Sequence, residues 1–122
     1  MNLEEFIKSQ IASVDDLRTL LLLSVNSGLD WNVNEVAGKL YLLPATAGAV
    51  LDRLTAKGLL TCSGEPPRFR YQPASAEIAG LVSELIELDR KRPVTLINMV
   101  YPAKKDIQAF ADAFKIKRET EN

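Results

Sequence analysis

Residues 34–60, NEVAGKLYLLPATAGAVLDRLTAKGLL, decide the fold of this chain. Apolar side chains recur at helical spacing on both sides of Pro44, and a proline disfavours helical geometry in the preceding residue while it suits the first turn of a new helix. The stretch therefore predicts a helix through Leu40 and a second helix over residues 45–57, which Gly58 ends. One face of the second helix is apolar, and the other carries Thr46, Ala49, Asp52 and Arg53.

The flanking segments extend this pattern in both directions. Upstream, helical spacing predicts a short helix from Leu3 to Ile11 and a central helix capped by Ser13. Either Asn32 or Asn34 can cap the helix that runs to Leu40. Downstream, residues 59–61 and 69–71 resemble two strands joined by a turn that contains glycine and prolines, which predicts a hairpin.

The C-terminal part is predicted to be helical. Ser75 opens a long amphipathic helix, and Pro93 forces a break or a restart. Residues 94–101 contain enough β-branched side chains to form a strand, but the helical segments on either side favour a helix. Residues 105–116 predict a last helix, and the polar residues 117–122 are expected to fray.

This order of elements resembles the winged helix-turn-helix superfamily, a mainly α fold with a small β-hairpin. In residues 34–60, Ala37 matches the small residue between the two helices, and Leu40 and Val50 match the apolar residues that hold them together. LDRLTAKGLL followed by RFRYQPAS is similar to the end of the recognition helix and the wing. Many members have glycine where this chain has Tyr41, so we expect the turn to be rebuilt.

The resemblance covers about residues 13–116 and implies a bacterial transcriptional regulator of MarR- or ArsR-like shape. In such folds the recognition helix enters the major groove, and the wing lies beside the backbone or the minor groove. On this chain those elements are residues 45–57 and residues 60–72. The residues that we expect at the DNA are Thr46, Ala49, Arg53, Lys57, Arg68 and Arg70.

These candidates have alternative interpretations. Thr46 also suits a helix start, and Arg53 could be a solvent-facing charge without a function. Arg68 and Arg70 alternate with aromatic residues, as on any exposed hairpin face, although two arginines on a wing favour phosphate contact. The recognition helix also offers few of the Arg, Lys, Asn and Gln side chains that read base edges.

Composition limits the classes of function. The 122 residues include one cysteine and no histidine, so structural zinc and the histidine-dependent nucleophile pairs are excluded, and we expect neither an enzyme nor a metal or other cofactor. The net charge is −1, but residues 44–71 carry four basic and two acidic side chains, which makes this segment alone positive. The N-terminus lacks the pattern of a secretory signal and no apolar run could span a membrane, so we expect a cytoplasmic protein.

The chain divides into a winged domain over residues 1–73, a helical extension over residues 74–116 and a tail over residues 117–122. The extension has more apolar surface than a small winged domain readily covers, so we expect it to pair in a two-fold homodimer. The candidate seam consists of Leu81, Leu85, Leu88 and Phe114. The alternative is that these helices fold back on their own winged domain.

The leading hypothesis is a dimeric regulator that binds double-stranded DNA at half-sites about one helical turn apart. The alternative is a winged-helix module that has kept the shape and binds a protein instead of DNA. The negative net charge and the recognition helix with few long polar side chains support this alternative. No residue identifies a small-molecule effector.

Overall fold

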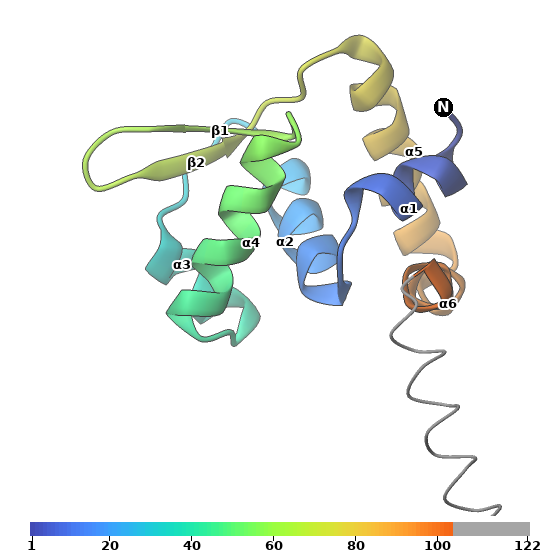
Figure 1. Cartoon of the computed structure of the whole chain (residues 1–122), viewed down its shortest axis with the longest axis horizontal. Coiled ribbons are helices and arrows are strands. Elements are labelled where there is room, and N and C mark those ends of the chain that lie inside the picture. The colour runs from blue at the N-terminus through green and yellow to red at the C-terminus, as the bar shows by residue number, and fades with distance from the viewer. Residues whose placement is uncertain (104–122) are drawn as a thin grey trace, which may run out of the picture.

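The computed structural model describes residues 1–103, which form six helices and a two-stranded antiparallel hairpin. This arrangement confirms the predicted winged-helix architecture (Figure 1). In chain order the elements are α1 (Leu3–Gln10), α2 (Val14–Val25), α3 (Val33–Leu40), α4 (Pro44–Ala56), β1 (Leu60–Ser63), β2 (Arg68–Tyr71), α5 (Ala76–Lys91) and α6 (Pro93–Ala103). The predicted last helix over residues 105–116 and the tail lie outside the described residues.

The helix starts follow from side-chain caps that the sequence predicts. The Ser13 hydroxyl accepts a hydrogen bond from the Asp16 N–H at 3.2 Å, and the Ser75 hydroxyl accepts one from the Ile78 N–H at 3.2 Å. Of the two asparagines considered for α3, Asn32 is the cap: it accepts from the Glu35 N–H at 2.8 Å, and the Glu35 carboxylate accepts from the Asn32 N–H at 2.9 Å. Residues 94–101 are helical, as favoured.

The turn between α3 and α4 contains a left-handed residue that is not a glycine. Tyr41 takes the left-handed conformation itself, with φ 59° and ψ 46°, and the N–H of Leu42 donates to the Ala37 carbonyl at 2.9 Å. Ala37 is 6% exposed, as expected of a small residue between two packed helices. The tyrosine therefore supplies the left-handed backbone geometry that glycine usually supplies at the C-terminal end of a helix.

The hairpin has one apolar and one polar face. Its register pairs Leu60 with Tyr71, Thr61 with Arg70, Cys62 with Phe69 and Ser63 with Arg68. Leu60 and Phe69 are buried towards the helices, so the arginines lie on the opposite face. Trp31 extends the sheet by one bridge, because its N–H donates to the Phe69 carbonyl at 2.8 Å and its carbonyl accepts from the Phe69 N–H at 2.7 Å.

A single hydrophobic core joins all six helices, and α2 lies at its centre with Leu17, Leu20 and Leu23 buried. In Figure 1, α3, α4 and the hairpin lie on one side of α2, and α1, α5 and α6 lie on the other. Helices α5 and α6 thus fold back on their own winged domain, which is the alternative considered above. Within residues 1–103 no helix is long and apolar enough to cross a membrane.

Candidate nucleic-acid interface

The outward face of α4 is an open stripe of mostly small side chains. Helix α4 packs against α2, α3 and β1 through Ala47, Val50, Leu51 and Leu54, which are all buried. The opposite face is exposed and consists of Ala45, Ala49, Asp52, Arg53 and Ala56. Of the predicted contacts on this helix, Ala49 lies in the middle of the stripe and Thr46 at its half-buried edge.

Arg53 starts on the exposed face, but its guanidinium turns back to the core. Its Nη2 donates to Asp16 Oδ1 at 2.6 Å and its Nε donates to Asp16 Oδ2 at 3.2 Å. The Asp16 side chain is 0% exposed, and the Ser13 hydroxyl also donates to its Oδ1 at 3.0 Å. The hydrogen bond to Asp16 raises the pKa of Arg53, against a smaller opposing effect of burial. This pair was not predicted from the sequence, and it makes Arg53 a link between α4 and the start of α2.

Lys57 also makes a contact within the chain. It follows α4 directly, and its Nζ donates to the carbonyl oxygen of Gln10, at the end of α1, at 3.0 Å. The ammonium group thus lies where the C-terminal end of a helix favours a cation. This contact ties α1 to the end of α4.

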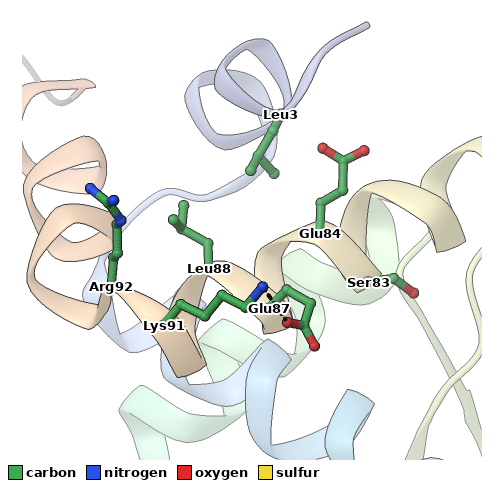
Figure 2. Close-up of a pocket in the computed structure, with 7 residues that line it drawn as sticks. All are labelled: Leu3, Ser83, Glu84, Glu87, Leu88, Lys91 and Arg92. Carbon is green, nitrogen blue, oxygen red and sulfur yellow. Dashed lines mark ion pairs between the residues drawn. The ribbon is translucent and has the colours of Figure 1, made fainter.

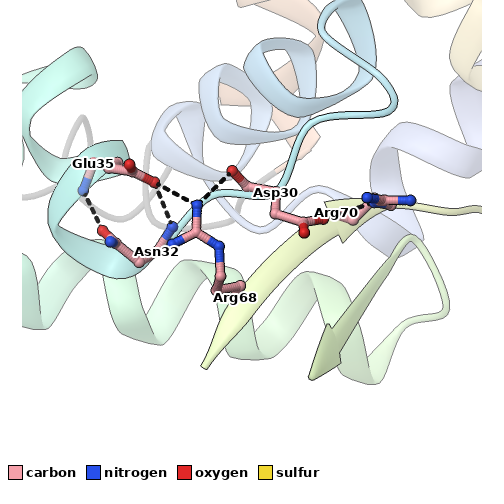
Figure 3. A network of polar contacts seen from close by, with 5 residues as sticks. All are labelled: Asp30, Asn32, Glu35, Arg68 and Arg70. Carbon is pink, nitrogen blue, oxygen red and sulfur yellow. Dashed lines mark hydrogen bonds and ion pairs between the residues drawn. The ribbon is translucent and has the colours of Figure 1, made fainter. Parts of the chain in front are cut away.

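The two wing arginines are paired with acidic residues that precede α3 or lie in its first turn (Figure 3). Arg70 Nε donates to Asp30 Oδ1 at 2.7 Å, and Arg68 Nη2 donates to the Asp30 carbonyl at 3.1 Å and to Glu35 Oε1 at 3.3 Å. All four charged side chains remain between two fifths and half exposed. The wing therefore presents two arginines whose charge is largely balanced by neighbouring carboxylates.

The remaining cations of this side of the molecule lie near the turn between α3 and α4. Lys39, in the last turn of α3, is exposed and forms no ion pair with any carboxylate of residues 1–103. Arg18 on α2 donates from Nη2 to the Leu40 carbonyl at 3.2 Å, at the end of α3. Arg18 was not among the predicted residues, and no sequence signal near it indicates this position.

The structure corrects the predicted dimer seam. Leu81 and Leu85 are 5% and 0% exposed within one chain, because α5 packs them against its own α1, α2 and α6. Neither side chain is available on the surface that a second copy would meet. Leu88 is half-buried and, with Leu3, lines a groove of about 460 Å³ between α1 and α5, rimmed by Glu84, Glu87, Lys91 and Arg92 (Figure 2). Phe114 lies outside the described residues.

No other type of site emerges from the described part of the chain. Within residues 1–103 no group of three or more cysteine, aspartate or glutamate side chains is placed to hold a metal ion. Tyr71 lies on the inner face of the hairpin, and burial raises its pKa. The surface formed by α4, the turn before it and the wing therefore remains the candidate interface.

Comparison with known proteins supports the fold alone. The sequence matches no family model and no curated protein. Among solved structures, the chain is similar to Rv1404 from Mycobacterium tuberculosis, with a TM-score of 0.53 and 20% sequence identity. The match covers 95% of this chain and 78% of Rv1404, so it includes both the winged part and the helices that follow it.

Proposed function

We propose that this protein binds duplex DNA and acts as a transcriptional regulator, with α4 entering the major groove and the wing beside the backbone. The observation that carries the proposal is the open stripe on α4, which no other part of residues 1–103 covers and beside which the hairpin projects (Figure 1). Helices α1, α5 and α6 pack on the far side of α2, away from this surface.

The small side chains of the stripe suit a close approach to the floor of the groove. A major groove about 12 Å wide admits a helix, and the methyl groups of Thr46 and Ala49 can contact thymine methyl groups. Few side chains here can hydrogen-bond base edges. We therefore expect much of the sequence preference to come from apolar contacts and from DNA shape.

The charges of this surface make the proposed binding modest. Arg68 and Arg70 must exchange their carboxylate partners for phosphates if they are to contribute. The carboxylate of Asp52, on the exposed stripe, would repel the phosphates of the DNA backbone. Because few phosphates are neutralised, we expect weak binding that is measurable at low ionic strength.

A charge placed in the middle of the stripe tests the proposal. We expect Ala49→Glu to abolish binding of a labelled mixture of genomic duplexes, measured by fluorescence anisotropy at low salt, because the carboxylate would face the groove. Thr95→Glu adds the same charge to an exposed position of α6, outside the groove between α1 and α5, and serves as the matched control. The proposal is wrong if the unmodified protein binds no duplex at low salt, or if both variants bind alike.

As part of this proposal the regulator is a two-fold homodimer that binds half-sites about 34 Å apart. Of the predicted seam residues within 1–103, Leu81 and Leu85 are buried, whereas Leu88 is half-buried and lines an open groove with Leu3. Light scattering should give twice the mass of one chain, and a Leu88→Glu variant should give the monomer mass. A monomer mass for the unmodified protein at micromolar concentration would contradict the dimer.

One observation favours a protein partner as the second candidate. Arg53, Arg68 and Arg70 are all matched with carboxylates, as on a surface that no longer binds phosphates. In that case, affinity purification should recover a stoichiometric protein while the purified chain gives no mobility shift with DNA.

A further inference from the structure

Tyr41 occupies a position where a tyrosine costs stability. It is the non-glycine residue with a positive φ among residues 1–103, and such a conformation costs about 1–2 kcal/mol for a residue with a Cβ. The residue is 92% exposed, and its side chain has no hydrogen bond, ion pair or ring contact with the described chain. No side-chain contact within residues 1–103 therefore offsets the conformational cost of a tyrosine at this position. Strained residues of this kind concentrate at functional sites.

A second exposed apolar side chain lies in the same turn. Leu43 is 73% exposed and directly precedes α4, where it occupies the N-cap position. Pro44 and Ala45 follow it and are also exposed, so the apolar surface of the turn continues into the open stripe of α4. Tyr41 and Leu43 are the two most exposed of the large apolar side chains in residues 1–103, and they lie two residues apart in this turn.

Two cations beside the turn form no ion pair with a carboxylate of residues 1–103, as is also true of Lys8 and Arg92 elsewhere on the molecule. Lys39 is two residues from Tyr41 and forms no ion pair with the described chain, and Arg18 reaches the carbonyl end of α3 next to it. On the wing and at Arg53, in contrast, each guanidinium meets a carboxylate within 3.3 Å. On the DNA-facing side proposed above, Lys39 and Arg18 are thus the cations near Tyr41 that keep their charge without a carboxylate partner, and a polyanion is the complementary ligand.

We propose that the turn between α3 and α4, through Arg18, Lys39, Tyr41 and Leu43, is the main contact of this protein with the sugar-phosphate backbone of duplex DNA. The inference rests on the proposed function and moves the backbone contact from the wing arginines to this turn. The Tyr41 hydroxyl donates to a phosphate oxygen, and its ring covers a deoxyribose together with Leu43. Arg18 and Lys39 neutralise the adjacent phosphates of the strand that borders the groove entered by α4.

The decisive variant is Tyr41→Gly, because it separates binding from folding. Glycine takes a positive φ without strain, so the unfolding temperature should stay the same or rise by about 2–5 °C. The affinity for a labelled duplex of random sequence at low salt should fall about tenfold, as expected when a contact worth about 1.4 kcal/mol is lost. Tyr41→Phe, which keeps the ring, should lose only the part contributed by the hydroxyl.

Two variants that each remove one lysine charge provide a matched comparison. Lys39→Gln should reduce the slope of log affinity against log salt by about one. Lys8→Gln makes the same charge change on α1, where Lys8 is exposed on the far side of the molecule, and should leave the slope unchanged. Both variants can be compared with the unmodified protein in the same titration.

The outcomes separate this inference from the proposed function. If the unmodified protein binds DNA and Ala49→Glu abolishes binding, but Tyr41→Gly retains full affinity, the role of the turn is overturned and the DNA-binding function stands. Equal salt slopes for Lys39→Gln and Lys8→Gln overturn it as well. If the unmodified protein binds no duplex, or if Tyr41→Gly disrupts only a protein complex, both the function and this inference fail.

Discussion

Asp16 and Arg53, which are 37 residues apart in the sequence, form a two-point ion pair that joins the first turn of α2 to the last turn of α4. The carboxylate is completely buried, whereas the guanidinium side chain is 42% exposed. Removing the cation would leave a buried carboxylate with the Ser13 hydroxyl and the Asp16 N–H near it. The arginine is therefore needed to keep that charge in the core.

The first prediction concerns this pair. We expect Arg53→Met, which keeps the aliphatic stem, to lower the free energy of unfolding by about 2 kcal/mol, less than the 3–5 kcal/mol of a fully buried pair because the guanidinium is partly solvated. The effect should be smaller in an Asp16→Asn background, since the amide carries no charge. Urea denaturation measures both. Arg90→Met, which removes an exposed pair with Glu87, is the control and should change little. An equal loss in both backgrounds would contradict the coupling.

How far the sequence predicts this molecule depends on how far apart the interacting residues are. Ser13, Asn32 and Ser75 cap their helices as expected, because a cap and its N–H partner are only a few residues apart. The hairpin was recognisable from the alternation around Arg70 and from the turn residues before it. These local signals are sufficient to define the winged helix.

The charge of the site was not predictable in the same way. Residues 44–71 look positive when counted alone, but Asp16, Asp30 and Glu35 come from the preceding part of the chain and pair with three of their four cations. A segment count cannot include carboxylates that only the tertiary structure brings near. The burial of Leu81 and Leu85 was missed for a related reason, because an apolar helical stripe looks the same whether it faces its own core or a second copy.

The second prediction concerns the wing. Asp30→Asn with Glu35→Gln should release Arg68 and Arg70, so that DNA affinity rises and the slope of log affinity against log salt becomes steeper by up to about two. Glutamine at position 35 can still accept the Asn32 N–H, so the cap of α3 should persist. Salt titrations by fluorescence anisotropy measure the slope. As a control, Glu4→Gln alters one exposed charge on α1, outside the groove between α1 and α5, and should have little effect. Unchanged affinity in the double variant would show that the wing does not touch DNA.

The third prediction concerns Thr19, a fully buried residue of α2 whose hydroxyl oxygen has no hydrogen-bond partner among the described residues. A buried hydroxyl without a partner costs about 1–3 kcal/mol, so Thr19→Val should raise the free energy of unfolding by about 1 kcal/mol. Thr55 on α4 is the matched control, because its hydroxyl donates to the Leu51 carbonyl at 2.8 Å and Thr55→Val would lose that bond. Thermal and urea unfolding should therefore show a gain for the first variant and none for the second. Equal shifts in both would mean that the Thr19 hydroxyl is satisfied in solution.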